Sequence, residues 1–212
     1  MQTETELKRA DTSLETLVNL ATTVPIITII SGKHEGKKTC AILISLGLKK
    51  YGKAIFFYNL DKETQFPTIV PQDKNPDLIV INCPLECSHI LLALPTKNRI
   101  NLLVIGDDPT SISDSYFLLK IYGRLELGLK RFYCLAHLVQ NRVAGIDSFN
   151  KLNEIISRFL DLESYSLFLL GNIPYCEEIS NFGHRQYTTD DLNYALSLYE
   201  DTIKELLVLL DN

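Results

Sequence analysis

The residues best suited to chemistry lie in a short polar loop that follows an apolar run. Residues 31–39 read SGKHEGKKT, after the run IITII at 26–30. The spacing G-x-x-x-x-G-K-[ST] binds nucleotide phosphates, because glycines let backbone amides turn inward while lysine and threonine reach the outer phosphates and Mg²⁺. Gly32, Lys38 and Thr39 match this spacing, but Lys37 stands at the second glycine position. The candidate phosphate-binding residues are Gly32, Lys33, Gly36, Lys37, Lys38 and Thr39.

Two interpretations of this basic loop remain open. Lys33, Lys37 and Lys38 crowd the expected start of a helix, where the helix dipole disfavours each cation by about 0.3–1 kcal/mol. An anion bound between them would explain the arrangement. The alternative is a solvated basic loop that binds no ligand.

Nucleotide hydrolysis needs carboxylates at the ends of neighbouring strands, which hold Mg²⁺ and order the attacking water. The second expected strand ends near Asn59 and Asp61 and the third ends at Asn82, so Asp61 alone supplies charge there. An amide brings no charge to a metal site. If Mg²⁺ binds, its ligands would be Thr39 and Asp61. Asp61 is also the candidate catalytic residue if the chain hydrolyses ATP.

Other polar residues near strand ends have structural interpretations. Asp107 and Asp108 follow a further expected strand and suit the capping of the next helix, with Ser111 or Thr110 as the predicted cap residue. His137 lies within an apolar run and is typical of a core histidine rather than a catalyst.

Length and composition indicate an ordinary globular protein. The chain has 212 residues, 46% of them hydrophobic, and a net charge of −5, which does not favour nucleic acid or anionic lipid. Its five scattered cysteines predict reduced thiols in the cytoplasm, and Cys83, Cys87 and His89 do not complete a zinc site. No apolar run reaches the roughly 20 residues that a membrane span requires.

Strand-like and helix-like segments alternate along the chain. This alternation predicts an α/β fold of three layers, a doubly wound, mainly parallel sheet covered by helices on both faces. Residues 1–24 are expected to form a tail with a short helix, and residues 25–212 a single domain. The expected strands are 26–30, 54–58, 77–82, 101–105, 132–139 and 166–170. The expected helices are 39–48, 112–122 and 147–159, with a helix or helical turn at 88–94.

The C-terminal segment has the most regular pattern. Thr188 and Asp191 have the spacing of a helix N-cap, and apolar residues from Leu192 to Leu210 then recur at helical intervals. This stripe is expected to pack on the sheet; a groove on a partner protein is the alternative.

Two stretches resemble the MinD/ParA-type deviant P-loop ATPases, and within them the bacterial flagellar-number regulators of the FlhG branch, also called FleN or YlxH. In the first, Ser31-Gly32-Lys33 and Lys38-Thr39 match the signature-lysine P-loop. The second reads DPTSISDSY at 108–116, with LKRF at 129–132 and GNIP at 171–174 after it. The likeness covers about residues 26–180 and implies a P-loop NTPase fold of the MinD type.

The departures from the family's pattern affect each part of an ATPase cycle. The family has glycines in the phosphate loop, acidic residues at the metal, an asparagine at the adenine and an aspartate after the Ile-Pro. The connection from residue 61 to 77, which carries switch and dimer elements in the family, is shorter here. The substituted positions are His34, Glu35, Lys37, Asn59, Asn82, His137 and Cys176.

These departures predict an FlhG-like pseudo-ATPase, a scaffold that controls flagellar number or placement through protein contacts. The resemblance implies as partners the GTPase FlhF, the flagellar switch proteins and a flagellar transcription activator. The alternative is a working MinD/ParA-type ATPase that binds Mg-ATP and dimerises on it; an interaction module unrelated to flagella is a third. We expect a cytoplasmic monomer without direct contact to nucleic acid or stable membrane insertion, which partners would recruit to the membrane or cell pole.

Overall fold

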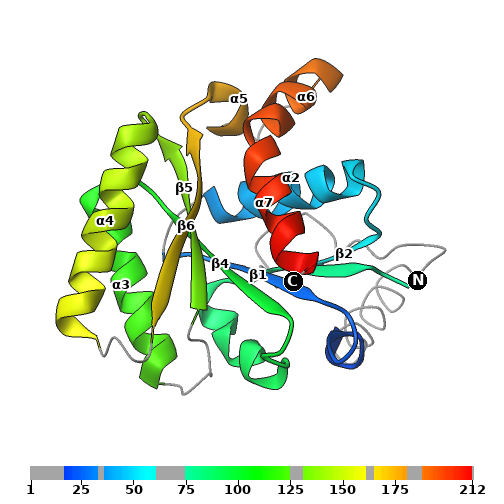
Figure 1. Ribbon diagram of the computed structural model, residues 1–212, viewed down its shortest axis with the longest axis horizontal. Helices are drawn as coiled ribbons and strands as arrows, with labels where there is room; N and C mark the ends of the chain where they lie inside the picture. Colours follow the sequence, from blue (N-terminus) through cyan, green and yellow to red (C-terminus); the bar gives the residue numbers. More distant parts are fainter. Residues whose placement is uncertain are drawn as a thin grey trace, which may run out of the picture.

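A six-stranded sheet, with strand order β2-β3-β1-β4-β5-β6, forms the centre of the protein (Figure 1). The computed structural model describes residues 17–32, 36–60, 75–124, 131–160, 165–180 and 188–211. Every strand pairing is parallel, which confirms the predicted sheet. The strands are β1 (Ile26–Ile30), β2 (Ile55–Asn59), β3 (Leu78–Asn82), β4 (Arg99–Ile105), β5 (Arg131–Val139) and β6 (Ser166–Pro174).

The β1 strand lies in the middle of the sheet, between β3 and β4. All five of its residues are buried, because helices cover both faces of the sheet at this point. Such a strand reads as a continuous apolar run rather than as alternating polar and apolar residues. Its central place puts the loop that follows it at the carboxyl edge of the sheet, beside the ends of β3 and β4.

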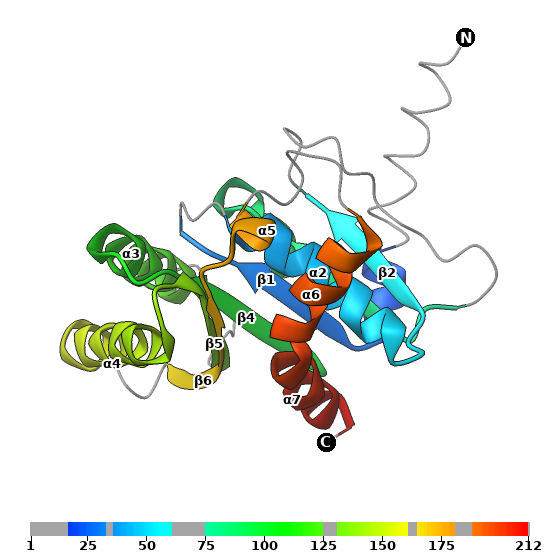
Figure 2. The same cartoon turned by 90° about the horizontal axis from the view of Figure 1, so that it is seen from above.

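Helices cover both faces of the sheet, as predicted. One face carries residues 17–21, which are helical, together with η1 (Leu85–Ala93), α3 (Pro109–Arg124) and α4 (Arg142–Phe159). The other carries α2 (Gly36–Lys50), α5 (Glu177–Ser180), α6 (Thr189–Leu198) and α7 (Glu200–Asp211). Figure 2 shows α3 and α4 on one side of β5 and β6 and α7 on the other. Each face therefore has its own apolar core.

Several helices begin earlier than predicted. The α4 helix starts at Arg142 because the side chain of Asn141 accepts a hydrogen bond from the Ala144 amide at 3.0 Å and caps its first turn. The segment predicted as a helix or helical turn at 88–94 is a 3₁₀ helix, η1, that begins at Leu85. Apolar periodicity marks the buried face of a helix and not its polar first turn, so these starts were missed.

The C-terminal stripe forms two helices instead of one. The predicted capping box is present, since Thr188 and Asp191 exchange hydrogen bonds of 3.1 and 3.0 Å. The break between α6 and α7 lies at Tyr199, whose side chain is fully buried against the sheet. Both helices pack on the sheet, as expected for the stripe.

The N-terminal prediction is covered in part. Residues 17–21 are helical and Leu17 is fully buried, whereas residues 1–16 of the predicted tail and helix lie outside the described residues. None of the helices in the described ranges combines the length and apolar character needed to cross a bilayer.

Candidate functional site at the carboxyl edge of the sheet

The two glycines of the loop lie against protein atoms. A Cβ at Gly32 would overlap Asp114 on α3, lying 2.9 Å from the Asp114 carbonyl carbon. A Cβ at Gly36 would overlap the imidazole of His137 at the end of β5. Backbone and a buried ring cannot move aside cheaply, so tight packing alone requires glycine at both positions. The sequence had indicated a phosphate as the reason for these glycines.

The first turn of α2 holds the remaining candidate residues. Lys37 and Lys38 are half-buried, Thr39 is buried, and this turn contains no acidic residue. Burial raises the pKa of Cys83 to about 12, and the nearby Lys37 acts against that rise. This interaction places the charge of Lys37 toward the end of β3. Lys33, the signature-lysine candidate, and Asp61 lie outside the described residues.

Two asparagines meet where a metal-binding ATPase needs carboxylates. Asn59 and Asn82 stand in register at the ends of β2 and β3. Asn82 Nδ2 donates a hydrogen bond of 2.8 Å to Asn59 Oδ1. Asn82 is fully buried, and its Oδ1 accepts no hydrogen bond from the described part of the chain. Two neutral amides bonded to each other are a poor ligand set for Mg²⁺, which prefers carboxylates and water.

The described residues therefore do not fit a bound Mg²⁺ at this edge. Within the described ranges, histidine, cysteine, aspartate and glutamate do not gather in any group of three that would hold a metal ion. Of the predicted ligand pair, Thr39 is buried on the first turn of α2 and Asp61 lies outside the described residues, so the pair stays a prediction.

Asp107 and Asp108 have structural partners, in agreement with their structural interpretation. Asp108 Oδ1 accepts a hydrogen bond of 2.9 Å from the Ser111 amide and so caps α3. Asp107 Oδ2 accepts one of 2.7 Å from the Gln140 amide after β5. The prediction of Thr110 or Ser111 as the cap was wrong: both are in the helix, and the Ser111 hydroxyl accepts from the Gly106 amide at 2.6 Å.

A buried polar cluster lies beneath the start of α2. Cys40 on α2, His137 on β5 and Tyr199 between α6 and α7 are all fully buried. The Cys40 Sγ and Tyr199 Oη atoms are 3.3 Å apart, and the His137 and Tyr199 ring centroids are 6.1 Å apart. Burial raises the pKa of Cys40 to about 12 and raises that of Tyr199 well above its usual value. The Cys40 thiol and the Tyr199 hydroxyl are thus protonated at physiological pH.

The backbone beside His137 is irregular. A β-bulge separates His137 from Val139, and Leu138 has φ 55°, a left-handed conformation that is rare for leucine. The predicted core histidine therefore lies next to a strained residue and against Gly36. Sequence reasoning missed Tyr199, whose only signal was its place in the C-terminal apolar stripe.

Cys176 lies where the family has an aspartate. Its Sγ is 2.7 Å from Glu178 Oε2, to which it donates a hydrogen bond. Burial, together with this hydrogen bond, raises the pKa of the Cys176 thiol. A protonated thiol turned toward Glu178 offers no negative charge of its own to a ligand.

Solved structures of other proteins share this fold. No protein-family model matches the chain. In solved structures, MinD of Aquifex aeolicus matches with a TM-score of 0.58 and 14% identity, over 87% of this chain and 97% of that one. MinD of Pyrococcus furiosus matches with a TM-score of 0.53 and 14% identity, over 87% and 99%. The chain has the MinD fold.

The chain also has sequence similarity to a protein of the flagellar branch. The antiactivator FleN of Pseudomonas aeruginosa is 32% identical over 112 residues, which make up 53% of this chain and 39% of FleN. The chain thus matches less than half of that relative's length. Together with the fold, this match confirms the resemblance to MinD/ParA-type ATPases of the FlhG branch.

Proposed function

We propose that this protein is an FlhG-like regulator of flagellar number or placement, which acts as a pseudo-ATPase scaffold through contacts with other proteins. The similarity to FleN, named as an antiactivator, supports the regulatory role. By the same resemblance, its partners would be a FlhF-type GTPase, flagellar switch proteins or a transcription activator. We place this protein in the cytoplasm, from which its partners would recruit it to the membrane or cell pole.

The pairing of Asn59 and Asn82 carries the pseudo-ATPase part of the proposal. The two side-chain amides bond to each other at 2.8 Å. They lie at the strand ends where an ATPase needs negative charge to hold Mg²⁺ and water. The half-buried Lys37 adds positive charge to the same region. Two neutral amides and a lysine offer Mg²⁺ no negative charge, and a protein scaffold does not require any there.

We expect no Mg²⁺-dependent turnover of ATP above background. Equilibrium titration with labelled ATP should give a Kd no tighter than about 1 mM, with or without Mg²⁺, because coordinated phosphate binding is lost. Replacing Lys37 by glycine should not restore turnover, since Asn59 and Asn82 still lack charge. Recovery of hydrolysis by Lys37→Gly alone would overturn the proposal, and Lys49→Gly at the exposed end of α2 is the matched control.

The second candidate is a working ATPase that dimerises on ATP. It is favoured by Lys38 and Thr39, which stand on the first turn of a helix directly after the central strand, as the phosphate motif requires. The scaffold proposal instead expects a monomer. Light scattering with and without Mg-ATP separates them, because a nucleotide-dependent doubling of mass that Lys33→Ala abolishes would overturn the monomer and favour the working ATPase.

A further inference from the structure

The strand β6 forms one edge of the sheet and pairs with β5 alone. Figure 2 shows it with α4 on one side and α7 on the other. Of its nine residues only Ile173 is buried, whereas four of the five residues of β2, the opposite edge strand, are buried. β6 is therefore the longer and the more open of the two edges.

The outer side of β6 carries backbone groups that the sheet does not use. A strand that pairs on one side leaves about half of its amides and carbonyls pointing away from its neighbour. Within the described part of the chain, no backbone group of a loop or helix bonds to the backbone of residues 166–170. Besides water, only another extended chain matches the spacing of these groups, since a helix uses its own amides and carbonyls internally.

β6 lacks most of the features that block pairing at a sheet edge. Natural edge strands are shielded by charged side chains, by proline, by bulges or by short length. The sequence of β6, SLFLLGNIP, contains no charged residue, and its proline, Pro174, is the last residue. One β-bulge is present, at Leu170, which has no partner in the register of β5 and β6. The four residues before the bulge, 166–169, pair regularly with β5 and form an unshielded edge.

Phe168 provides apolar surface beside this edge. Its side chain is 45% exposed, and its ring contacts that of Tyr133 on β5 at 5.6 Å between centroids. The preceding residue, Leu167, packs against the core under α3 and α4, so Phe168 lies on the opposite face of the sheet. A strand added at the edge would place a side chain about 5 Å from Phe168, where an aromatic or β-branched residue would extend the ring pair.

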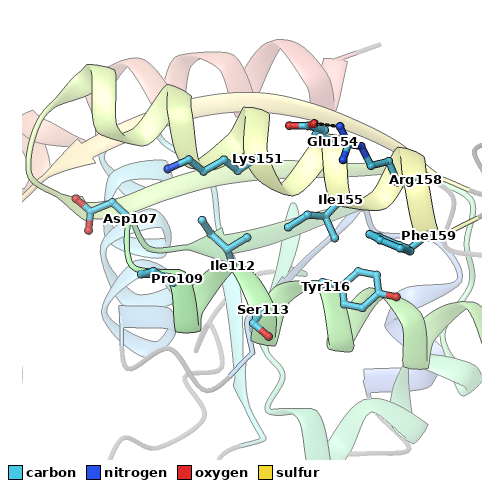
Figure 3. A pocket seen from close by; sticks show the side chains of 10 residues that line it. All are labelled: Asp107, Pro109, Ile112, Ser113, Tyr116, Lys151, Glu154, Ile155, Arg158 and Phe159. Carbon is cyan, nitrogen blue, oxygen red and sulfur yellow. Dashed lines mark hydrogen bonds and ion pairs between the residues drawn. The ribbon is translucent and has the colours of Figure 1, made fainter.

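The groove of about 450 Å³ between α3 and α4 has no comparable selectivity (Figure 3). In Figure 3 the side chain of Ile155 points from α4 toward α3 and makes the space between them apolar. The charged residues that line the groove balance, with Asp107 and Glu154 against Lys151 and Arg158. The directional hydrogen-bonding groups of the β6 edge, in contrast, specify an extended backbone.

We propose that an extended segment of a partner protein adds to the sheet beside β6, hydrogen-bonded along residues 166–169 and with an aromatic or β-branched side chain next to Phe168. The inference rests on the proposed scaffold role, which needs a contact surface and expects a monomer, so the added strand belongs to another protein. This edge does not involve the phosphate loop, so an ATPase result and a strand-binding result can fail separately.

The probe is a labelled seven-residue peptide in which threonine alternates with valine around a central phenylalanine, with N-methyl groups on alternate residues. These groups block one edge of the peptide against fibril formation and leave the other edge free to pair. The control peptide is N-methylated at every residue, which removes the donors of both edges. In fluorescence anisotropy with the full chain, the probe should bind at least about tenfold more tightly than the control. Equal affinities, or no binding by either peptide, would overturn the proposal.

Hydrogen exchange and one pair of variants locate the binding. With saturating probe, the amides of residues 166–169 that point outward should exchange at least about tenfold more slowly, while those of β2 stay unchanged. Phe168→Lys puts a charge at the edge and should weaken the probe about tenfold or more. Phe117→Lys, at a residue of α3 that is 55% exposed, is the matched control and should have no effect. Protection of β2 instead of β6, or equal effects of the two variants, would contradict the assignment.

Light scattering without nucleotide tests for a second copy of the chain at the same edge. A chain that stays monomeric and binds the probe supports a strand from another protein. Concentration-dependent dimerisation that Phe168→Lys abolishes would identify a second copy as the occupant and overturn the partner strand.

Discussion

Replacing Tyr199 by alanine is expected to lower the free energy of unfolding by about 3–5 kcal/mol, as for other large aromatic residues deleted from a core. Tyr199 is fully buried at the junction of α6 and α7. Its ring packs near His137 and its hydroxyl lies 3.3 Å from Cys40 Sγ, so it joins the C-terminal helices to both β5 and α2. Its loss would leave a cavity beneath the start of α2.

Urea unfolding followed by circular dichroism measures this change. Tyr194→Ala is the matched control, because Tyr194 is on α6 and about half exposed, and its loss should cost less than about 0.5 kcal/mol. Tyr199→Phe removes only the contact with Cys40 and should cost about 1 kcal/mol. If Tyr199→Ala and Tyr194→Ala have equal effects, the C-terminal helices do not hold the core as described.

The change Asn82→Asp is expected to destabilise the fold by about 3 kcal/mol at neutral pH. It converts a fully buried amide into a carboxylate that the neighbouring Asn59 cannot neutralise. The positive charge of Lys37, which acts on Cys83 after the end of β3, opposes this cost in part.

The pH dependence of this loss has a definite sign. Burial disfavours the charged form and so raises the pKa of the introduced carboxyl group above its value of about 3.9 in the unfolded chain. The loss should be small below pH 3.9 or so, where the group is neutral in both states, and grow as pH rises toward the folded-state pKa. Denaturant unfolding at pH 4 and pH 7 measures the difference.

Two outcomes would contradict this account of the strand ends. Asn59→Asp is the control, because Asn59 is only partly buried and its replacement should cost clearly less. An Asn82→Asp variant as stable as the wild type at pH 7 would mean that this edge accepts negative charge without a metal. A variant that gained Mg²⁺-dependent ATP turnover would support the alternative that the chain is a working ATPase.

Local sequence patterns determined the fold class. Strands buried on both faces appear as apolar runs, as in Ile26–Ile30, and helices begin at side chains that bond to the backbone within three residues, as Thr188 does. Such signals are read within a few neighbours along the chain, so the strand–helix order could be predicted. The resemblance in the loop at 31–39 and in 108–116 also followed from the sequence.

Contacts between distant residues were decided only by the tertiary structure. The bond between Asn82 and Asn59 joins positions 23 residues apart, and it depends on the register of β2 against β3. The neighbours of Gly32 and Gly36 come from α3 and β5, and two consecutive crossovers place α3 and α4 side by side on one face. Register and packing arise when the elements assemble, so a pattern confined to one element carries no signal of them.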